Sequence, residues 1–182
     1  ETPRELLAEM GALGFMGMTI PEEWGGAAAD NVSYVLAMQE IAGGDGGLST
    51  IMSVNNSPVA AALLSYGSTD QKERFLKPLA KGEVTAAFSL TEPHTGSDAS
   101  NLKTRAEKQG NKYVLNGAKQ FITSGKNGQM IIVFAITDKD AGKKGMSAFI
   151  VETDTPGYEV VRVEEKLGLN CSDTCQLAFT DM

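Results

Sequence analysis

The sequence is poor in the residues that build metal centres and disulfide frameworks. Its 182 residues include only two cysteines, Cys171 and Cys175, and a single histidine, His94. Two cysteines separated by three residues form neither a disulfide framework nor a four-ligand zinc site, and one histidine cannot form a histidine cluster. We therefore expect no metal site, and a reducing compartment is the default for such a chain.

An excess of positive charge and long apolar runs are also lacking. Sixteen lysines and arginines stand against 23 acidic residues, a net charge of −7, and the isoelectric point is near 4.8. Such a chain has no general attraction to nucleic acid or to an anionic membrane surface. No stretch approaches the roughly 20 apolar residues that span a bilayer, and no signal peptide is visible. We expect no nucleic-acid binding and no membrane insertion.

The common nucleotide and hydrolase motifs are missing as well. There is no G-x-G-x-x-G, and Gly125-Lys126 lacks the earlier glycine and the following Ser/Thr of a P-loop. His94 has no G-x-S-x-G serine to activate, which disfavours a hydrolytic triad. A nucleotide would have to be held in another way.

The first 83 residues are typical of helices. Composition is ordinary for a globular protein, with 42% hydrophobic and 21% charged residues. Capping residues stand before apolar residues at helical spacing, which predicts helix starts at four places: Thr2, Asn31, Ser57-Pro58 and Ser68. We interpret residues 1–83 as a helical domain.

From about residue 84 the apolar period becomes that of strands. Eight short strands are predicted, at residues 84–90, 103–108, 112–115, 118–123, 130–137, 146–152, 158–163 and 174–180. Asn116-Gly117 is a strong signal for a two-residue hairpin, and Gly110-Asn111 predicts a second turn. The fold class is therefore α+β, with a helical segment followed by an antiparallel β-barrel or sandwich over residues 84–182. Because the chain opens on Glu1 and stops just after a strand-like run, we expect it to be a piece of a longer protein.

Polar residues cluster where the first predicted strand ends, between Phe88 and Asp98. Small hydroxyls and a glycine in this run offer O–H and N–H donors to an anion or to the polar edge of a ring. The alternative is a proline turn with local hydrogen bonds, which by itself accounts for Pro93, Gly96 and Asp98. Glu92 would act as a base only if shielded from water, and we expect its turn to be solvated.

A second small cluster, residues 121–123, lies at the end of another predicted strand. From local sequence alone, Phe121 is expected in the core and Thr123 is expected to cap the strand with its hydroxyl.

Two motifs together resemble the acyl-CoA dehydrogenases, flavoenzymes that desaturate acyl thioesters. Residues 91–98 match the family's T-E-P-x-x-G-S-D, and residues 116–123 match its N-G-x-K-x-[WF]-I-T. The resemblance covers the whole chain and implies the later part of the family's amino-terminal helical domain (1–83) and its middle β-domain (84–182). It also implies that the carboxy-terminal helical domain lies outside this chain.

The resemblance implies a site for FAD without a Rossmann fold. Thr91 would hydrogen-bond the pyrimidine side of the flavin, Thr123 would reach the edge near N5, and Phe121 would pack against the ring. Ser97 would serve both the diphosphate and the acyl-CoA substrate. The cofactor-binding residues implied in this way are Phe88, Leu90, Thr91, Gly96, Ser97, Phe121, Ile122 and Thr123. The family's catalytic glutamate lies beyond the middle domain, so we assign no catalytic residue here and expect the chain alone to be inactive.

The implied reaction removes an α-proton from an acyl-CoA and transfers a β-hydride to flavin N5, giving a trans-2-enoyl-CoA. Electrons would pass to an electron-transfer flavoprotein, and the full-length protein would be a homotetramer or dimer. Its compartment would be the bacterial cytoplasm or the mitochondrial matrix. The stretch at residues 52–57 is most similar to members that act on short acyl chains.

Two other functions stay open. An acyl-CoA oxidase or flavin monooxygenase relative would react with oxygen, and a stand-alone β-domain binding module would have no redox role.

Two residues depart from the family pattern. His94 stands where the family often has glycine, and Phe121 replaces the commoner tryptophan. Two consequences stay open at His94: the turn differs from that of other members, or the imidazole approaches the ligand.

Overall fold

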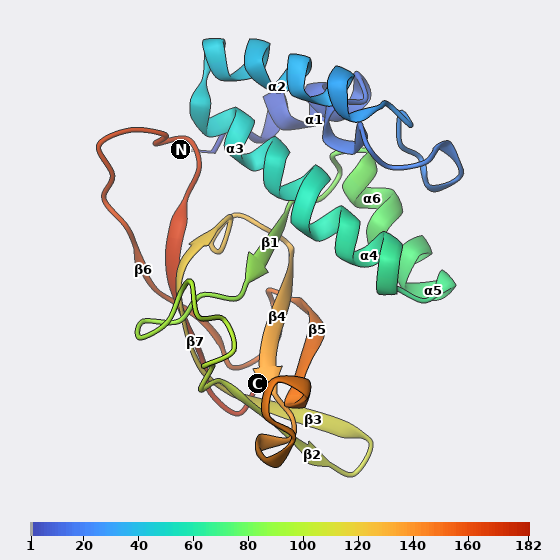
Figure 1. Ribbon diagram of the computed structural model, residues 1–182. Coiled ribbons are helices and arrows are strands. Elements are labelled where there is room, and N and C mark those ends of the chain that lie inside the picture. Colours follow the sequence, from blue (N-terminus) through green and yellow to red (C-terminus); the bar gives the residue numbers. More distant parts are fainter. Residues whose placement is uncertain (1) are drawn as a thin grey trace. The chain divides into compact units, whose positions relative to one another are not determined.

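The computed structural model describes residues 2–182, which form two compact units (Figure 1). The helical unit consists of the chain up to Ala86 together with Glu165–Ser172. The sheet unit consists of Ala87–Glu164 and Asp173–Met182. A segment near the carboxyl end therefore returns to the helical unit, which the sequence does not indicate.

Short helices follow one another through the helical unit. They are α1 (Arg4–Ala12), η1 (Phe15–Gly17), η2 (Glu22–Trp24), α2 (Asn31–Gly44), α3 (Gly46–Val54), η3 (Asn55–Val59), α4 (Ala60–Tyr66), α5 (Thr69–Gln71), η4 (Lys72–Leu76) and α6 (Lys77–Ala80). Buried apolar side chains of α1, η1 and α3 form a core cluster, which contains Leu7, Met10, Met16, Leu48, Ile51 and Met52.

The predicted capping at Ser68 is confirmed. Its hydroxyl accepts the Gln71 N–H at 3.2 Å, and Gln71 Oε1 accepts the Ser68 N–H at 2.9 Å, a complete capping box. The start of α2 is one residue earlier than predicted, because the Asp30 carboxylate accepts the Ser33 N–H at 2.7 Å and leaves Asn31 as the first helical residue.

One predicted helix start is confirmed without its predicted cap, and another is wrong. A helix follows Thr2, since α1 begins at Arg4, but the residue before it is Pro3, which has no capping side chain, and the Thr2 hydroxyl donates to the Cys171 carbonyl at 2.8 Å. Ser57-Pro58 begins no helix, because α3, η3 and α4 form one continuous helical run over residues 46–66 with Pro58 inside its π-helical turn.

Two buried asparagines hold this π-helical turn. Asn56 Nδ2 donates to the Phe15 carbonyl at 2.8 Å and to the Met52 carbonyl at 3.1 Å. Asn55 Oδ1 accepts the Ala86 N–H at 3.1 Å. Polar groups removed from water must find such partners, so these residues fix the approach of the chain to its first strand.

The sheet is mixed, with seven strands in the described residues, and not antiparallel with eight as predicted. The strands are β1 (Ala86–Ser89), β2 (Arg105–Gln109), β3 (Lys112–Thr123), β4 (Met130–Ile136), β5 (Met146–Glu152), β6 (Tyr158–Val163) and β7 (Thr174–Phe179). Their order is β1-β4-β2-β3-β7-β6, and β5 pairs with β4. The contact between β2 and β4 is parallel, with Arg105 opposite Ile136. A short parallel contact of this kind leaves no trace in strand periodicity.

The hairpin predicted at Asn116-Gly117 is wrong, because β3 runs straight through it. Asn116 uses its side chain to pair with Asp181 in both directions, at 3.0 and 2.9 Å. A Cβ on Gly117 would lie 2.5 Å from Thr104 Oγ1, so glycine is needed here for close packing and not for a turn. The turn at Gly110-Asn111 is confirmed, since β2 and β3 pair as neighbours around it with Gln109 opposite Lys112.

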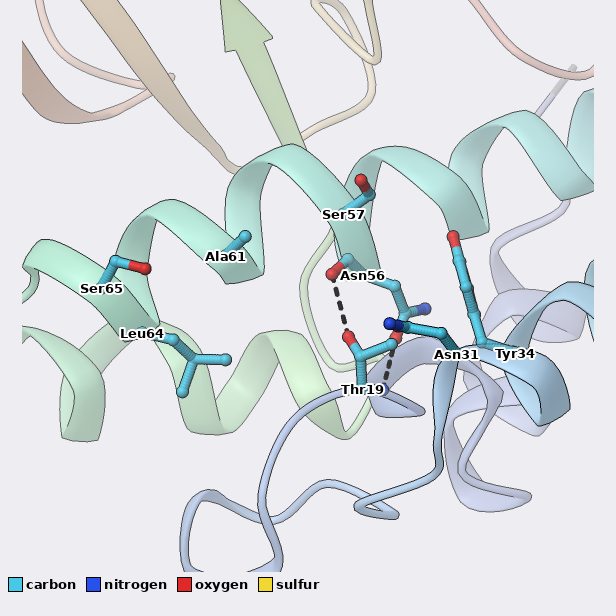
Figure 2. A pocket seen from close by; sticks show the side chains of 8 residues that line it. All are labelled: Thr19, Asn31, Tyr34, Asn56, Ser57, Ala61, Leu64 and Ser65. Carbon is cyan, nitrogen blue, oxygen red and sulfur yellow. Dashed lines mark hydrogen bonds between the residues drawn. The ribbon is translucent and has the colours of Figure 1, made fainter.

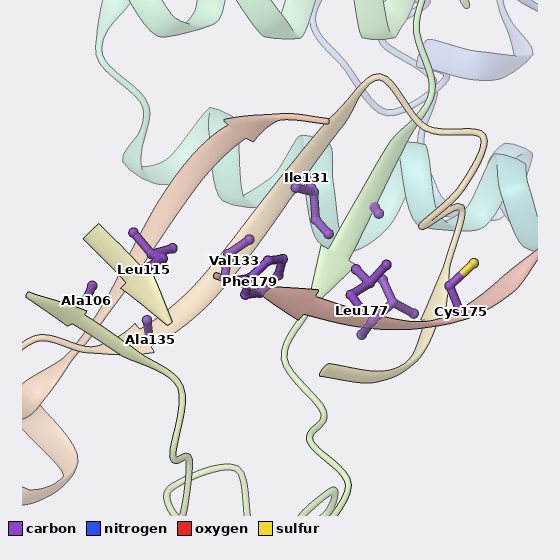
Figure 3. Packing of buried hydrophobic residues seen from close by; sticks show 10 residues of the cluster. Ala106, Leu115, Ile131, Val133, Ala135, Cys175, Leu177 and Phe179 are labelled. Carbon is purple, nitrogen blue, oxygen red and sulfur yellow. The ribbon is translucent and has the colours of Figure 1, made fainter. Parts of the chain in front are cut away.

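Small and aliphatic side chains from most strands fill the interior of the sheet unit (Figure 3). Those labelled there come from β4 (Ile131, Val133, Ala135), β7 (Cys175, Leu177, Phe179), β2 (Ala106) and β3 (Leu115). Their alternate spacing on each strand is that of a sheet with one face toward a core. Within residues 2–182, no helix is both long and apolar enough to cross a membrane.

Candidate functional site

The two motifs singled out in the sequence meet in the sheet unit. The Gln120 N–H donates to the Thr91 carbonyl at 2.9 Å. One residue away, Lys119 Nζ donates to the Leu90 carbonyl at 3.0 Å. The segment that leaves β1 therefore runs beside the second half of β3, although 29 residues separate them in sequence.

A buried ion pair lies at this junction. Glu92 Oε1 is 3.0 Å from Lys119 Nζ, and their side chains are 2% and 0% exposed. The Glu92 carboxylate also accepts the backbone N–H groups of Lys103 at 2.7 Å and Thr104 at 3.0 Å, and His94 Nε2 lies 3.8 Å from Oε2. The expectation that Glu92 sits in a solvated turn is wrong.

Burial and hydrogen bonding shift the pKa of both groups of this pair. Burial by itself would raise the pKa of Glu92, but hydrogen bonds from Thr104, Lys103 and Lys119 outweigh it and lower the pKa below its ordinary value. Burial lowers the pKa of Lys119, and Glu92 opposes that effect. The carboxylate and the ammonium each stabilise the charged form of the other.

The turn that follows Glu92 is closed by local hydrogen bonds. Glu92 and Thr95 exchange backbone N–H bonds at 2.9 and 3.0 Å, and the Thr95 hydroxyl donates to the Asp98 carbonyl. His94 Nε2 lies 2.8 Å from the Asn101 carbonyl. Gly96 and Ser97, which follow this turn, are exposed. The local turn therefore explains much of this segment and still leaves Ser97 open to a ligand.

Local sequence predicts Phe121 in the core, and this prediction is wrong. The residue is 63% exposed. The pairing of β3 with β7 shifts register between Lys119 and Ile122, and Phe121 adopts a left-handed backbone with φ of 57°. A bulge of this kind turns a side chain to the other face of a strand. Its neighbour Ile122 is 2% exposed and packs in the core, so its side chain faces away from Phe121's open surroundings.

A second buried carboxylate, Asp173, holds the loop after β3. Its oxygens accept the Lys126 N–H at 2.7 Å and Asn127 Nδ2 at 3.0 Å, and its carbonyl accepts the Ser124 N–H at 3.1 Å. Thr123, opposite Thr174 in the register, is half-buried directly before this loop. Sequence reasoning missed Asp173, because nothing local marks a residue 46 positions from its partner.

The remaining predicted site residues are placed as follows. Phe88 on β1 packs its ring against Phe134 with centroids 5.0 Å apart. Gly96 lies beside Thr91, since a Cβ on Gly96 would be 3.8 Å from Thr91 Cγ2. Thr91 and Leu90 are half-buried. Leu90, Thr91 and Gly96 are thus brought next to β3, while Phe88 belongs to the packing of β1 on β4.

The helical unit has a separate pocket of about 330 Å³ that includes none of these residues (Figure 2). Its lining is Thr19, Asn31, Tyr34, Asn56, Ser57, Ala61, Leu64 and Ser65. Thr19 and Asn56 bridge one wall by the hydrogen bonds drawn there. Among residues 2–182, no group of three or more metal-ligating side chains is found.

Comparison with known proteins gives the family. The chain matches the acyl-CoA dehydrogenase N-terminal domain over residues 1–83 and the acyl-CoA dehydrogenase middle domain over residues 87–182. It therefore belongs to the acyl-CoA dehydrogenase family.

Two relatives show how near it stands to named members. It is 47% identical over 98% of its length to an acyl-CoA dehydrogenase of Bacillus subtilis, of which it covers 47%. It is 41% identical over 99% of its length to the short-chain specific acyl-CoA dehydrogenase of Clostridium acetobutylicum, of which it covers 48%. The chain thus spans about half the length of the relatives it matches.

Solved structures share its fold. Butyryl-CoA dehydrogenase of Megasphaera elsdenii superposes with a TM-score of 0.93 at 41% identity, covering 100% of this chain and 48% of that one. A structure titled for the electron transferring flavoprotein of Acidaminococcus fermentans superposes with a TM-score of 0.96 at 43% identity. The match covers 100% of this chain and 48% of that one. A glutaryl-CoA dehydrogenase of Mycobacterium smegmatis in complex with FADH2 superposes with a TM-score of 0.92 at 38% identity. The match covers 100% of this chain and 45% of that one.

Proposed function

We propose that the full-length protein is an FAD-dependent acyl-CoA dehydrogenase and that the sheet unit supplies one wall of its flavin site. The supporting observation is the bond from the Gln120 N–H to the Thr91 carbonyl, which joins the two family motifs. Through it, the donors of residues 91–97 and 121–123 lie on segments that touch. The FADH2 bound to the glutaryl-CoA dehydrogenase relative supports the choice of cofactor.

The donor set fits a flavin. Thr91 and Thr123 are half-buried hydroxyls, and Phe121 is an exposed aromatic side chain on the bulge, two residues before Thr123. In the proposal, the threonines donate to the polar edges of the ring and Phe121 packs against its face. Ser97 serves the diphosphate or the acyl-CoA, and the core residue Ile122 contributes only its backbone. When bound, FAD accepts the hydride, and donors at its edges stabilise the negative charge that develops there.

No residue of this chain is proposed as the catalytic base. Glu92 stays outside that role because its carboxylate already accepts bonds from Lys119, Lys103 and Thr104. A buried carboxylate with a lowered pKa that already accepts three hydrogen bonds is a poor proton acceptor. The proposal therefore places the base in a part of the protein beyond these 182 residues.

A short acyl-CoA is the proposed substrate and an electron-transfer flavoprotein the proposed electron acceptor. The relatives named short-chain specific and the butyryl-CoA dehydrogenase structure support the first. The structure titled for an electron transferring flavoprotein supports the second. Asn55 and Asn56 of the short-chain-like stretch are buried and bonded within the helical unit, so they shape that unit through packing. A homotetramer or dimer, in the bacterial cytoplasm or the mitochondrial matrix, completes the proposal.

The test is made on the full-length protein. We expect it to bind one FAD per subunit, and its flavin absorbance to bleach when butyryl-CoA is added without oxygen. Reoxidation by an electron-transfer flavoprotein, with slow reoxidation by air, is expected of a dehydrogenase. Fast reoxidation by air would indicate an oxidase, and absence of FAD would overturn the proposal.

A further inference from the structure

One ion pair differs from the others described for this chain by its burial. The side chains of Lys119 and Glu92 are 0% and 2% exposed, whereas those of Lys77 and Glu73 on the helical surface are 36% and 51% exposed. Exposed pairs contribute little to stability, and buried pairs lose much of their attraction to desolvation. Stability alone is therefore a weak reason for placing this pair inside the sheet unit.

The pair joins three segments that are distant in sequence. Lys119 Nζ on β3 donates to the Leu90 carbonyl and to Glu92 Oε1. The Glu92 carboxylate in turn accepts the N–H groups of Lys103 and Thr104, which lead into β2. Each bond has a fixed direction, so together they determine where the backbone around Thr91 lies relative to β3.

The positions that this pair controls adjoin the proposed ligand contacts. Leu90 and Glu92 stand on either side of Thr91, and Lys119 stands two residues before Phe121 at the start of the register shift. The Gln120 N–H reaches the Thr91 carbonyl between these points. A change in the pair would move Thr91 and the bulge relative to each other without removing any ligand contact.

We propose that Glu92 and Lys119 are positioning residues, which hold Thr91 and the Phe121 bulge in the geometry that binds the flavin. The inference rests on the proposed function. Neither side chain touches the ligand in this proposal, and they act through the backbone of residues 90–92 and 119–121. Removal of both charges with side chains of similar size would preserve packing, but it would give up the ammonium bonds to Leu90 and Glu92 and weaken those that the carboxylate accepts from Lys103 and Thr104.

The test uses the full-length protein with the double variant Glu92→Gln/Lys119→Met, which leaves no unpaired buried charge. The matched control is Glu73→Gln/Lys77→Met, the same substitutions at the exposed pair. Three quantities are measured: hydrogen exchange of the Gln120 amide, the dissociation constant of FAD, and the visible spectrum of bound FAD. Amides of the buried strand β4 report on the fold in general. If the double variant does not fold, Glu92→Gln alone is measured in the same way, since it keeps the bond from Lys119 to Leu90.

We expect faster exchange at Gln120, unchanged exchange in β4, and FAD binding weaker by about tenfold, as for the loss of one ordinary hydrogen bond. The control should match the unsubstituted protein in all three. Unchanged Gln120 exchange with unchanged FAD affinity and spectrum would overturn the positioning role and leave the proposed function standing. Failure of the unsubstituted protein to bind FAD would overturn the proposed function, and this inference with it.

Discussion

Asp173 accepts the backbone N–H of Lys126 at 2.7 Å and thereby connects the start of β7 to the loop that follows β3. The same carboxylate accepts Asn127 Nδ2 at 3.0 Å and the Cys175 thiol at 3.3 Å. It is 8% exposed. This residue therefore determines the course of the chain immediately after Thr123, one of the proposed flavin contacts.

Asp173→Asn should destabilise the protein by about 1–3 kcal/mol, because an amide nitrogen would face donors that now meet a carboxylate oxygen. The free energy of unfolding from denaturant titration measures this. Asp154→Asn, an exposed residue in the turn between β5 and β6, is the matched control and should change the free energy by less than about 0.5 kcal/mol. Equal effects at the two positions would contradict the role given to Asp173.

Thr91→Val/Thr123→Val keeps side-chain bulk and removes two hydroxyl donors from the proposed flavin site. About 1–3 kcal/mol is at stake for each unsatisfied partner on the ring, so we expect weaker FAD binding and slower flavin reduction. Thr137→Val/Thr153→Val is the control, since those hydroxyls bond the Gly145 and Gly128 carbonyls elsewhere in the sheet unit. An unchanged flavin spectrum, affinity and reduction rate in the first variant would contradict the assignment.

Phe121 combines an exposed ring with a left-handed backbone, and two variants separate these properties. Both Phe121→Ala and Phe121→Gly should weaken FAD binding, because both remove the ring. Phe121→Gly should be more stable than Phe121→Ala by about 1 kcal/mol, since a φ of 57° strains any residue with a Cβ.

The control for Phe121 is Lys112, an exposed residue at the start of the same strand. Lys112→Gly should be less stable than Lys112→Ala, the usual order in a strand. If the alanine variant were more stable than the glycine variant at both positions, the left-handed backbone at Phe121 would cost no free energy of folding. Full FAD affinity in either Phe121 variant would remove the ring from the proposed site.

Ser97→Ala should weaken binding of FAD or acyl-CoA more than His94→Gly does. Ser97 is exposed at the turn with its hydroxyl open to a ligand, whereas His94 Nε2 is engaged with the Asn101 carbonyl at 2.8 Å. Loss of that bond should lower stability by about 1 kcal/mol and leave ligand affinity nearly unchanged. Dissociation constants for both ligands test this, and the reverse ranking would show that the turn presents His94 to the ligand.

Acid should destabilise the protein in part through Glu92. Its pKa in the folded protein lies below the ordinary value of 4.5, so the folded state binds this proton less readily than the unfolded chain. Its contribution to stability is therefore present above pH 4.5 and is lost as the pH falls through the folded-state pKa. The Glu92→Gln variant should show a smaller loss of unfolding free energy between pH 6 and pH 3. An identical slope in the two proteins would contradict the lowered pKa.

The sequence alone carries the family and much of the local structure. The motifs at residues 91–98 and 116–123 indicate acyl-CoA dehydrogenases, and the family match confirms this. The capping box at Ser68 and the turn at Gly110-Asn111 are also predicted correctly. These features are local: capping and tight turns depend on residues within a few positions of one another.

Only the tertiary structure decided which side chains are buried at the candidate site and how the strands are arranged. Glu92 is buried because Lys119 and two backbone N–H groups from distant segments meet it. Phe121 is exposed because the pairing of β3 with β7 shifts beside it, and β3 continues through Asn116-Gly117 because Thr104 packs closely on that glycine. Each outcome depends on contacts between segments far apart in the chain, and such contacts leave no periodic signal in the sequence that forms them.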